Sequence, residues 1–357
     1  MTPDWVPVRD ELRGEEPYGA PQIDVPVQLN TNENPFGPSE ATARDIADEV
    51  FRAATSLNRY PDREAAVLRA ALADYLGHGL TVDQVWAANG SNEVMQQILQ
   101  AFGGPGRTAL SFAPTYSMYP EYARNTHTHW VEGLRRDDFS IDVDAAVDLI
   151  GREKPDVVFL ASPNNPTGTA IDPAELRAIV EAAPGVVVVD EAYAEFRRAG
   201  TPTSLELLSE FPRLLVTRTM SKAFAFAGGR LGYVAADPAI VDVLRVVRLP
   251  YHLSSVSQAA ALAALRHAEE MLAQVDALRT SRDEVAAWLA GEGFDVAESD
   301  TNFILFGTFP DRHATWRALL DRGVLIREVG PVGWLRVSIG TPDEMEAFKQ
   351  ALKEVTA

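Results

Sequence analysis

One lysine of this sequence stands in surroundings that favour chemistry at its amine. Lys222 lies within Thr217–Arg230, a stretch of mostly small and apolar residues. Burial among such residues lowers the pKa of an amine, which makes the neutral, nucleophilic form available near neutral pH. A surface lysine whose stem packs on apolar neighbours is the competing interpretation. Thr219, Ser221 and Arg230 stand close by and could donate hydrogen bonds to a phosphate.

A carboxylate ends a second apolar stretch. Asp190 follows Gly185–Val189, and a buried carboxylate without a partner is costly. We therefore expect Asp190 to meet a cation or a proton donor, although a purely structural arginine would also satisfy it. Ser162–Gly168 follows the apolar run Val157–Ala161. Ligands bind at such carboxyl ends of strands in α/β sheets, but a loop of this composition also makes an ordinary turn.

A third segment is suited to an anion. Gly90-Ser91-Asn92 joins an expected strand to an expected helix, and free N–H groups at a helix start attract phosphate. A plain helix cap fits these residues equally well. Taken with Lys222 and Asp190, the segment matches the needs of pyridoxal 5′-phosphate. That cofactor requires a phosphate cradle, an amine for a Schiff base, and a carboxylate for its ring nitrogen.

Longer strings of residues resemble a known enzyme family. Ser162–Gly168, Asp190–Tyr193 and Ser221–Gly232 resemble the fold-type I aminotransferases. Four further strings are similar to the histidinol-phosphate aminotransferase branch of that family: Asn30–Pro35, Arg59–Asp62, Pro114–Tyr119 and Leu335–Gly340. The matches keep the family's order across nearly the whole chain. The resemblance implies an α/β fold, with a large domain built on a mostly parallel seven-stranded α/β/α sheet and a smaller α+β domain.

The resemblance also implies roles for the matching residues. Lys222 would form the Schiff base and then act as the general base, while Asp190 would pair with the ring nitrogen. Asn165 and Tyr193 would hydrogen-bond the phenolic oxygen of the cofactor, and Tyr116 would stack on its ring. The phosphate would be held by Ser91, Asn92, Thr219, Ser221 and Arg230.

Four residues would form the substrate site in this family. Arg327 and Arg336 look like its substrate-anion arginines, because a guanidinium fork suits both phosphate and carboxylate. Tyr18 and Asn32, in the N-terminal segment, would close over the substrate. One site could then receive a phosphate monoester and a dicarboxylate in turn.

The same resemblance implies a homodimer with shared active sites. Tyr60 would reach the phosphate of the neighbouring subunit's cofactor, and Tyr251 would enter the neighbour's substrate site. Without the resemblance, both would be ordinary partly buried aromatic residues.

The implied activity is a reversible ping-pong amino transfer between L-histidinol phosphate and 2-oxoglutarate, which yields imidazole-acetol phosphate and L-glutamate in histidine biosynthesis. An aromatic aminotransferase is an alternative, because Tyr116, Tyr119 and Tyr122 form a cluster beside the expected site. A noncatalytic module that binds a phosphorylated ligand is another. The presence of Lys222 together with Asp190 argues against that module.

Composition excludes several other functions. The formal net charge of −19 opposes binding to nucleic acids and to anionic membranes. There is no cysteine, so thiolate catalysis is excluded. His127 and His129 have no further ligand at suitable spacing, and we expect no metal site. No apolar run approaches the ~18 residues that span a bilayer, and no signal peptide is visible, which predicts a cytoplasmic protein.

The elements that must position these residues follow from apolar patterning. Buried strands are predicted at Val85–Ala88, Thr108–Phe112, Val157–Ala161, Val186–Asp190, Leu214–Thr217 and Leu231–Ala235. Helices are predicted at Arg63–Leu76, Asn92–Phe102, Asp142–Arg152 and Pro173–Ala182, with Asp142 and Asp172 as N-caps. Apolar strands separated by helices indicate a sheet that is covered on both faces.

Beyond Pro250 a different unit is expected. A single long helix is predicted from about Ser257 to Ala290, followed by strands at Asn302–Phe306, Val324–Arg327 and Leu335–Ile339. The proline-rich first 40 residues should form an irregular arm. We therefore predict three regions: 1–45 as the arm and part of the small domain, 46–255 as the large cofactor-binding domain, and 256–357 as the small C-terminal domain.

Overall fold

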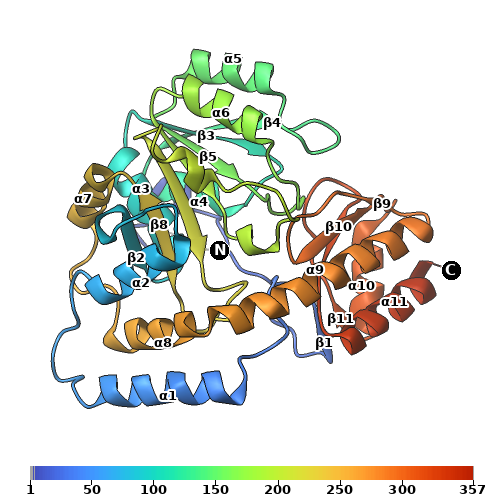
Figure 1. Cartoon of the computed structure of the whole chain (residues 1–357). Coiled ribbons are helices and arrows are strands. Elements are labelled where there is room, and N and C mark those ends of the chain that lie inside the picture. The colour runs from blue at the N-terminus through green and yellow to red at the C-terminus, as the bar shows by residue number, and fades with distance from the viewer. Residues whose placement is uncertain (1–2, 4, 357) are drawn as a thin grey trace.

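The computed structural model describes residues 3 and 5–356. Its largest sheet has seven strands in the order β2-β8-β7-β6-β5-β3-β4, and only β8 runs antiparallel to its neighbours (Figure 1). The strands are β2 (Val85–Ala88), β3 (Thr108–Ala113), β4 (His129–Leu134), β5 (Val157–Ala161), β6 (Val186–Asp190), β7 (Leu214–Thr219) and β8 (Gly232–Ala236). The predicted mostly parallel seven-stranded sheet is confirmed.

Helices cover both faces of this sheet, as predicted. One face carries α3 (Ser91–Phe102), α4 (Met118–Asn125) and α7 (Pro238–Val247). The other carries α2 (Ala66–Leu76), α5 (Val143–Glu153), α6 (Pro173–Ala182) and α8 (Ser255–Arg266). The side chains of β5 alternate between the two cores, with Phe159 in the first and Leu160 in the second. Because both faces are buried, every residue of β5 and β6 is buried, and the strands are almost wholly apolar.

The C-terminal unit holds two smaller sheets. One is antiparallel, in the order β12-β10-β9, and the other pairs β1 with β11 in parallel. The strands are β1 (Val27–Gln28), β9 (Asp295–Val296), β10 (Phe303–Gly307), β11 (Val324–Leu325) and β12 (Leu335–Ser338). The helices are α9 (Ala268–Gly291), α10 (Arg312–Asp321) and α11 (Pro342–Thr356). Pairing of β1 with β11 joins the N-terminal segment to this unit (Figure 1).

Two further sets of helices complete the described chain. Helix α1 (Glu40–Ala54) packs against α8 and spans the predicted domain boundary at residue 45, and the predicted domain division stays a prediction. Short 3-10 helices lie at η1 (Asp10–Leu12), η2 (Val82–Gln84), η3 (Ala194–Phe196) and η4 (Ser204–Leu207). Asp142 and Asp172 cap α5 and α6 as predicted.

The single long helix predicted near residues 257–290 is wrong. The helix is interrupted at His267, whose φ of −107° and ψ of 24° lie outside the helical region. The His267 ring and the Arg266 guanidinium both contact the carboxylate of Asp45 on α1, each at 3.0 Å. These contacts come from a segment more than two hundred residues away in sequence. The apolar pattern of the sequence carries no sign of such distant contacts, so it predicts one helix where the structure has α8 and α9.

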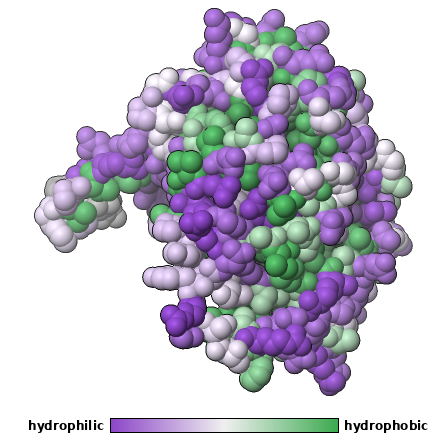
Figure 2. Space-filling view, turned by 60° about the vertical axis from the view of Figure 1, so that its left-hand side comes forward, coloured by the Kyte–Doolittle hydropathy of each residue, from purple (hydrophilic) through white to green (hydrophobic). Residues whose placement is uncertain are grey.

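Exposed apolar side chains gather on the side of the molecule that carries α1, α2 and α7 (Figure 2). They include Phe51, Tyr60, Val67, Val246 and Leu249, each at least 70% exposed. Groups of exposed apolar side chains of this kind mark interaction sites in proteins. We call these five residues the apolar face.

None of the helices in residues 3 and 5–356 combines the length and the apolar character needed to cross a lipid bilayer. The cytoplasmic location stays a prediction.

Candidate active site

One cavity lies where the carboxyl ends of the parallel strands meet. β6 and β7 end at Asp190 and Thr219, and Ala161 at the end of β5 also lines the cavity. β2 leads through a short turn into Ser91 at the start of α3. β8 runs the opposite way, so Arg230 precedes it at this same edge. The sheet topology therefore brings together side chains that are far apart in sequence.

Asp190 meets proton donors, one of the two outcomes expected from its position. Its Oδ2 accepts a hydrogen bond from the Tyr119 hydroxyl at 2.9 Å. Its Oδ1 accepts from the Thr217 hydroxyl and from the Ala192 N–H, both at 3.2 Å. Burial raises the pKa of Asp190, and these three donors oppose that effect by stabilising the ionised form.

Lys222 extends into the cavity as the sequence predicted. Its Nζ donates a hydrogen bond to the Thr31 carbonyl at 3.0 Å. Burial, together with the nearby Arg336 and Arg230 guanidinium groups and against the opposing charge of Glu33, lowers the pKa of Lys222 to about 8. A neutral, nucleophilic amine is therefore accessible near physiological pH.

The start of α3 offers donors to an anion. No side chain caps this helix, so the N–H groups of Ser91 and Asn92 remain available. Gly90 has a φ of +83°, and a Cβ there would lie 2.5 Å from Nη2 of Arg230. Glycine is thus favoured by the positive φ of the turn, and a side chain here would displace the Arg230 guanidinium that packs on it. Among the described residues, Arg230 has no carboxylate within 4.0 Å, so its charge is available to a ligand.

Two arginines face each other on the opposite side of the cavity. Arg327 and Arg336 form an isolated antiparallel bridge, with both backbone hydrogen bonds at 2.9 Å. Nη1 of Arg327 and Nε of Arg336 are buried and have no hydrogen-bond partner among the described residues. Burial, together with the charge of Arg327 and against the opposing effect of Tyr193, lowers the pKa of Arg336 to about 10. Two like charges side by side, with unused donors, make a receptor for an anion.

Three side chains connect the cavity to the N-terminal segment. Asn32 donates from Nδ2 to the Tyr193 hydroxyl at 3.0 Å and accepts from the Ser338 hydroxyl at 2.9 Å. Arg336 donates to Oδ1 of Asn165, which leaves the amide N–H₂ of Asn165 as its remaining donor group. Tyr18 accepts from the Ser117 hydroxyl at 3.2 Å. Asn32 and Tyr18 therefore link the N-terminal segment to other parts of the cavity wall.

Comparison with known proteins identifies the family. The family model "Aminotransferase class I and II" matches residues 24–352. A histidinol-phosphate aminotransferase of Thermobifida fusca is 62% identical over 353 residues, which cover 99% of this chain and 96% of that protein. The chain belongs to the histidinol-phosphate aminotransferase family. Another relative of this name, from Mycobacterium marinum, is 55% identical and covers 100% of this chain and 94% of its own length.

Solved structures agree with this family and point to its cofactor. The Sinorhizobium meliloti histidinol-phosphate aminotransferase, in complex with pyridoxal-5′-phosphate, superimposes with a TM-score of 0.83 at 27% identity, covering 93% of this chain and 91% of that one. Members of the family depend on pyridoxal phosphate. The cavity fits that cofactor, because it combines anion donors at the start of α3 with the amine of Lys222 and the carboxylate of Asp190.

Nearly every site residue predicted from the family resemblance lines this cavity. They are Tyr18, Asn32, Ser91, Asn92, Tyr116, Asn165, Asp190, Tyr193, Thr219, Ser221, Lys222, Arg230, Arg327 and Arg336. Of the three clustered tyrosines only Tyr116 is among the lining residues, and Tyr119 and Tyr122 lie behind it. Tyr60 and Tyr251 do not line the cavity of their own chain.

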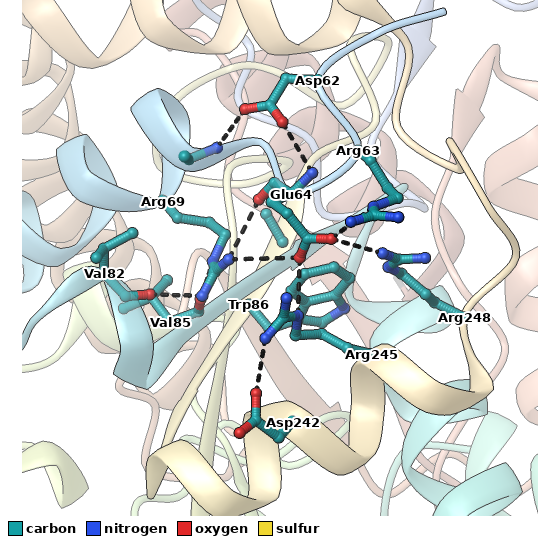
Figure 3. Close-up of polar contacts among 12 residues, drawn as sticks. Asp62, Arg63, Glu64, Arg69, Val82, Val85, Trp86, Asp242, Arg245 and Arg248 are labelled. Atoms are coloured by element: carbon teal, nitrogen blue, oxygen red, sulfur yellow. Dashed lines mark hydrogen bonds and ion pairs between the residues drawn. The ribbon is translucent and has the colours of Figure 1, made fainter.

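Tyr60 and Tyr251 instead stack on each other at the surface. Their ring centroids are 4.3 Å apart with an interplanar angle of 14°, and their exposed fractions are 80% and 40%. Glu64 ties the two segments together, because Nε of Arg245 and Nη2 of Arg248 donate to its oxygens at 2.7 and 2.8 Å (Figure 3). The stacked pair therefore lies at the molecular surface, where Tyr60 is itself part of the apolar face.

The pKa of Lys222 predicts how the cofactor-free protein captures pyridoxal phosphate. Capture needs the neutral amine, and the pKa of this amine is lowered to about 8. The capture rate should therefore rise about tenfold per pH unit below that value and level off above it. Rapid mixing with absorbance detection between about pH 6 and about pH 10 measures it. A free alkylamine of known pKa corrects for titration of the cofactor, and a rate still climbing at the top of this range would contradict the prediction.

Proposed function

We propose that this chain transfers an amino group between L-histidinol phosphate and 2-oxoglutarate, with pyridoxal 5′-phosphate as cofactor. The observation that carries the proposal is the paired arginine receptor, Arg327 and Arg336, in the same cavity as Lys222. A phosphate monoester and a dicarboxylate are both anions that suit guanidinium forks. The relatives that carry the name histidinol-phosphate aminotransferase support the same substrate.

Several residues that line the cavity each have their own role in the proposed reaction. When bound, pyridoxal phosphate supplies an electron sink for the pair released as the substrate Cα–H bond breaks. Nζ of Lys222 takes the proton from that carbon and returns a proton later in the transfer. Asp190 would hold a proton on the ring nitrogen. Asn165 and Tyr193 would donate hydrogen bonds to the phenolic oxygen, and Tyr116 would pack on the ring.

The phosphate of the cofactor would be held at the sheet edge. The backbone N–H groups and side chains of Ser91 and Asn92 face it from α3, where the helix dipole favours negative charge. Thr219, Ser221 and Arg230 complete the set from the segment around β7 and β8. These hydroxyl groups and the one guanidinium would anchor the cofactor through its phosphate, which leaves Nζ of Lys222 to the chemistry.

Arg336 should contribute strongly to substrate recognition. Replacing it with glutamine removes a buried guanidinium whose Nε has no other partner. We expect R336Q to lower kcat/KM for histidinol phosphate and for 2-oxoglutarate by about 100-fold, mainly through KM. Steady-state kinetics with each substrate measures it. Arg317→Gln, on the exposed side of α10, is the matched control and should change neither constant. A loss for only one substrate would show that the two anions do not share Arg336.

A direct comparison of substrates tests the proposed function. We expect kcat/KM for histidinol phosphate to exceed that for phenylalanine, because phenylalanine has no phosphate for the paired arginines. Clear preference for phenylalanine would favour an aromatic aminotransferase instead. Failure to turn over any amino donor in the presence of bound cofactor would favour a noncatalytic ligand-binding module.

The proposal includes a homodimer whose two active sites are shared. The apolar face and the stacked pair of Tyr60 and Tyr251 support it, since both are exposed in one chain. We expect a dimer mass by light scattering, and a monomer when Val246→Glu places a charge on the apolar face. Val332→Glu is the matched control, because Val332 is 91% exposed but lies in the C-terminal unit. A monomeric wild type, or equal effects of both variants, would contradict this interface.

A further inference from the structure

We propose that Tyr119 is a positioning residue for the reaction, whose hydroxyl holds the Asp190 carboxylate ionised and in place for the ring nitrogen of the cofactor. This inference rests on the proposed function, which gives Asp190 that task. Tyr119 does not line the cavity, so it touches neither substrate nor cofactor and acts through Asp190.

The hydrogen bonds of Asp190 are divided unequally between its two oxygens. Thr217 and Ala192 both donate to Oδ1, whereas Oδ2 accepts from Tyr119 at 2.9 Å and has no second donor among the described residues. Tyr119 is therefore the only donor among the described residues that holds Oδ2, while Thr217 and Ala192 hold the same carboxylate through Oδ1. A hydrogen bond to a carboxylate is also shorter and stronger than one between neutral groups.

The direction of this hydrogen bond follows from the two groups. Tyr119 is fully buried, and burial together with the charge of Asp190 raises the pKa of the phenol well above its ordinary value. The hydroxyl therefore keeps its proton and donates it to the carboxylate. Donation to the ionised form lowers the pKa of Asp190 and opposes the effect of burial.

Packing fixes the Tyr119 hydroxyl from two sides. The Tyr119 ring stacks on Phe159 of β5, with centroids 4.9 Å apart and an interplanar angle of 11°. Its edge meets Tyr116 at 5.5 Å and 87°. Tyr119 thus supports both the carboxylate for the ring nitrogen and the tyrosine expected to pack on the ring. A group held in this way needs no reorganisation when the cofactor binds.

Other polar groups around Asp190 do not replace Tyr119. From the end of β6, the carboxylate of Glu191 raises the pKa of Asp190, although Arg218 pairs with Glu191 at 2.6 Å. From β7 only the Thr217 hydroxyl reaches it. From the flanking loops Tyr116 and Tyr193 face the same region as neutral phenols, because burial raises the pKa of each. No cation pairs with Asp190 within 4.0 Å in the described part of the chain.

Binding of pyridoxamine phosphate to the cofactor-free protein tests the role of Tyr119 without turnover. We expect Tyr119→Phe to weaken binding about tenfold at neutral pH. Without its donor, Asp190 has a higher pKa and becomes neutral at higher pH. As the pH is lowered, binding of pyridoxamine phosphate by the variant should therefore begin to weaken at a higher pH than binding by the wild type. Equal binding by wild type and variant across the pH range would overturn the proposal.

Two matched variants separate this role from simple packing. Tyr122→Phe removes a buried hydroxyl from the same helix, one that has no hydrogen-bond partner in the described chain, and should leave the pH profile unchanged. Incorporation of 3-fluorotyrosine at position 119 keeps the hydroxyl and makes it a stronger donor. With 3-fluorotyrosine at position 119, the loss of pyridoxamine phosphate binding at acid pH should therefore begin at a lower pH than in the wild type. A shift in the same direction as Tyr119→Phe would contradict the proposal.

A cofactor analogue with carbon in place of the ring nitrogen gives the most direct readout. Asp190 has no ring N–H to meet in this analogue, so wild type and Tyr119→Phe should bind it equally. Equal losses for the analogue and for pyridoxamine phosphate would mean that Tyr119 acts through general packing, which would overturn the inference. If the wild type binds neither pyridoxal phosphate nor pyridoxamine phosphate, the proposed function fails as well. Normal wild-type binding with no effect of Tyr119→Phe defeats the inference alone.

Discussion

Replacing Lys222 with alanine is expected to reduce kcat for amino transfer by about 10⁴-fold or more. The variant loses both the nucleophilic amine and the base that moves the substrate proton, and no second lysine lines the cavity among the described residues. Steady-state kinetics with histidinol phosphate and 2-oxoglutarate measures the loss. The shortened side chain gives up one hydrogen bond to a backbone carbonyl and only enlarges an existing cavity, so the thermal unfolding temperature should change little.

Two observations make this result specific to the amine. Lys222→Ala should still bind pyridoxamine phosphate, because the donors at the start of α3 and Arg230 are intact. A small primary amine in the buffer should restore part of the activity, since it can take the same proton. Turnover within tenfold of the wild type would show that Lys222 is not the base.

Asp190→Asn is expected to lower kcat/KM by about 10³-fold, which is the effect of losing one preorganised electrostatic group in a buried site. Asparagine has the same shape and its oxygen can still accept from Tyr119, so the fold should persist. The variant cannot hold a full negative charge against the ring nitrogen. Single-turnover kinetics with histidinol phosphate isolates the chemical step from substrate binding.

The matched control for this prediction is Asp190→Glu, which keeps the charge but moves it by one methylene group. It should recover part of the lost rate, as expected for electrostatic support of the ring nitrogen. If Asp190→Asn keeps more than a tenth of the wild-type rate, the charge of Asp190 contributes little to the reaction.

Much of the fold could be predicted because the central strands are buried on both faces. The four consecutive valines before Asp190 and the apolar run Val157–Ala161 leave few other possibilities, and the observed bounds of β5 and β6 agree with them. N-caps were equally clear at Asp142 and Asp172, where a side-chain oxygen accepts from the first turn. In these places the local chemistry and the tertiary structure agree.

Two predicted helix bounds failed, one because of a contact with a distant segment and one because of a local side-chain contact. His267 interrupts a helix that has a continuous helical pattern, because Asp45 of α1 binds both His267 and Arg266. The helix predicted from Arg63 begins only at Ala66, because the Asp62 carboxylate accepts the N–H groups of Glu64 and Ala66. Neither contact leaves a periodic signal in the sequence.

The residues of the candidate site could also be predicted only in part from the sequence. Lys222 and Asp190 could be found from residue type and from the ends of apolar runs. Tyr119 could not be assigned to Asp190, since a tyrosine in an aromatic cluster has many possible neighbours. Nζ of Lys222 donates to the backbone carbonyl of Thr31. Every residue has such a carbonyl, so the residue types in the sequence could not predict this acceptor. Tyr60 and Tyr251 are not among the residues that line the cavity of their own chain, and their contacts with a neighbouring subunit stay predictions.

Net charge was a poor guide to the ligand. The chain carries −19 overall, yet the cavity is lined by Lys222, Arg230, Arg327 and Arg336, with Asp190 as its only carboxylate among the described residues. Recognition of anions is therefore local. The acidic surface concerns the solubility of the protein rather than the choice of ligand.

The bridge between Arg327 and Arg336 also has a thermodynamic consequence for the empty enzyme. Two adjacent guanidinium groups with unused N–H donors bind whatever small anion the buffer contains, and a ligand that binds only the folded state stabilises it. Inorganic phosphate at 100 times its dissociation constant would add ~2.7 kcal/mol to the free energy of unfolding. The same ion would compete with both substrates, so a buffer that protects the protein during storage would slow it during assay.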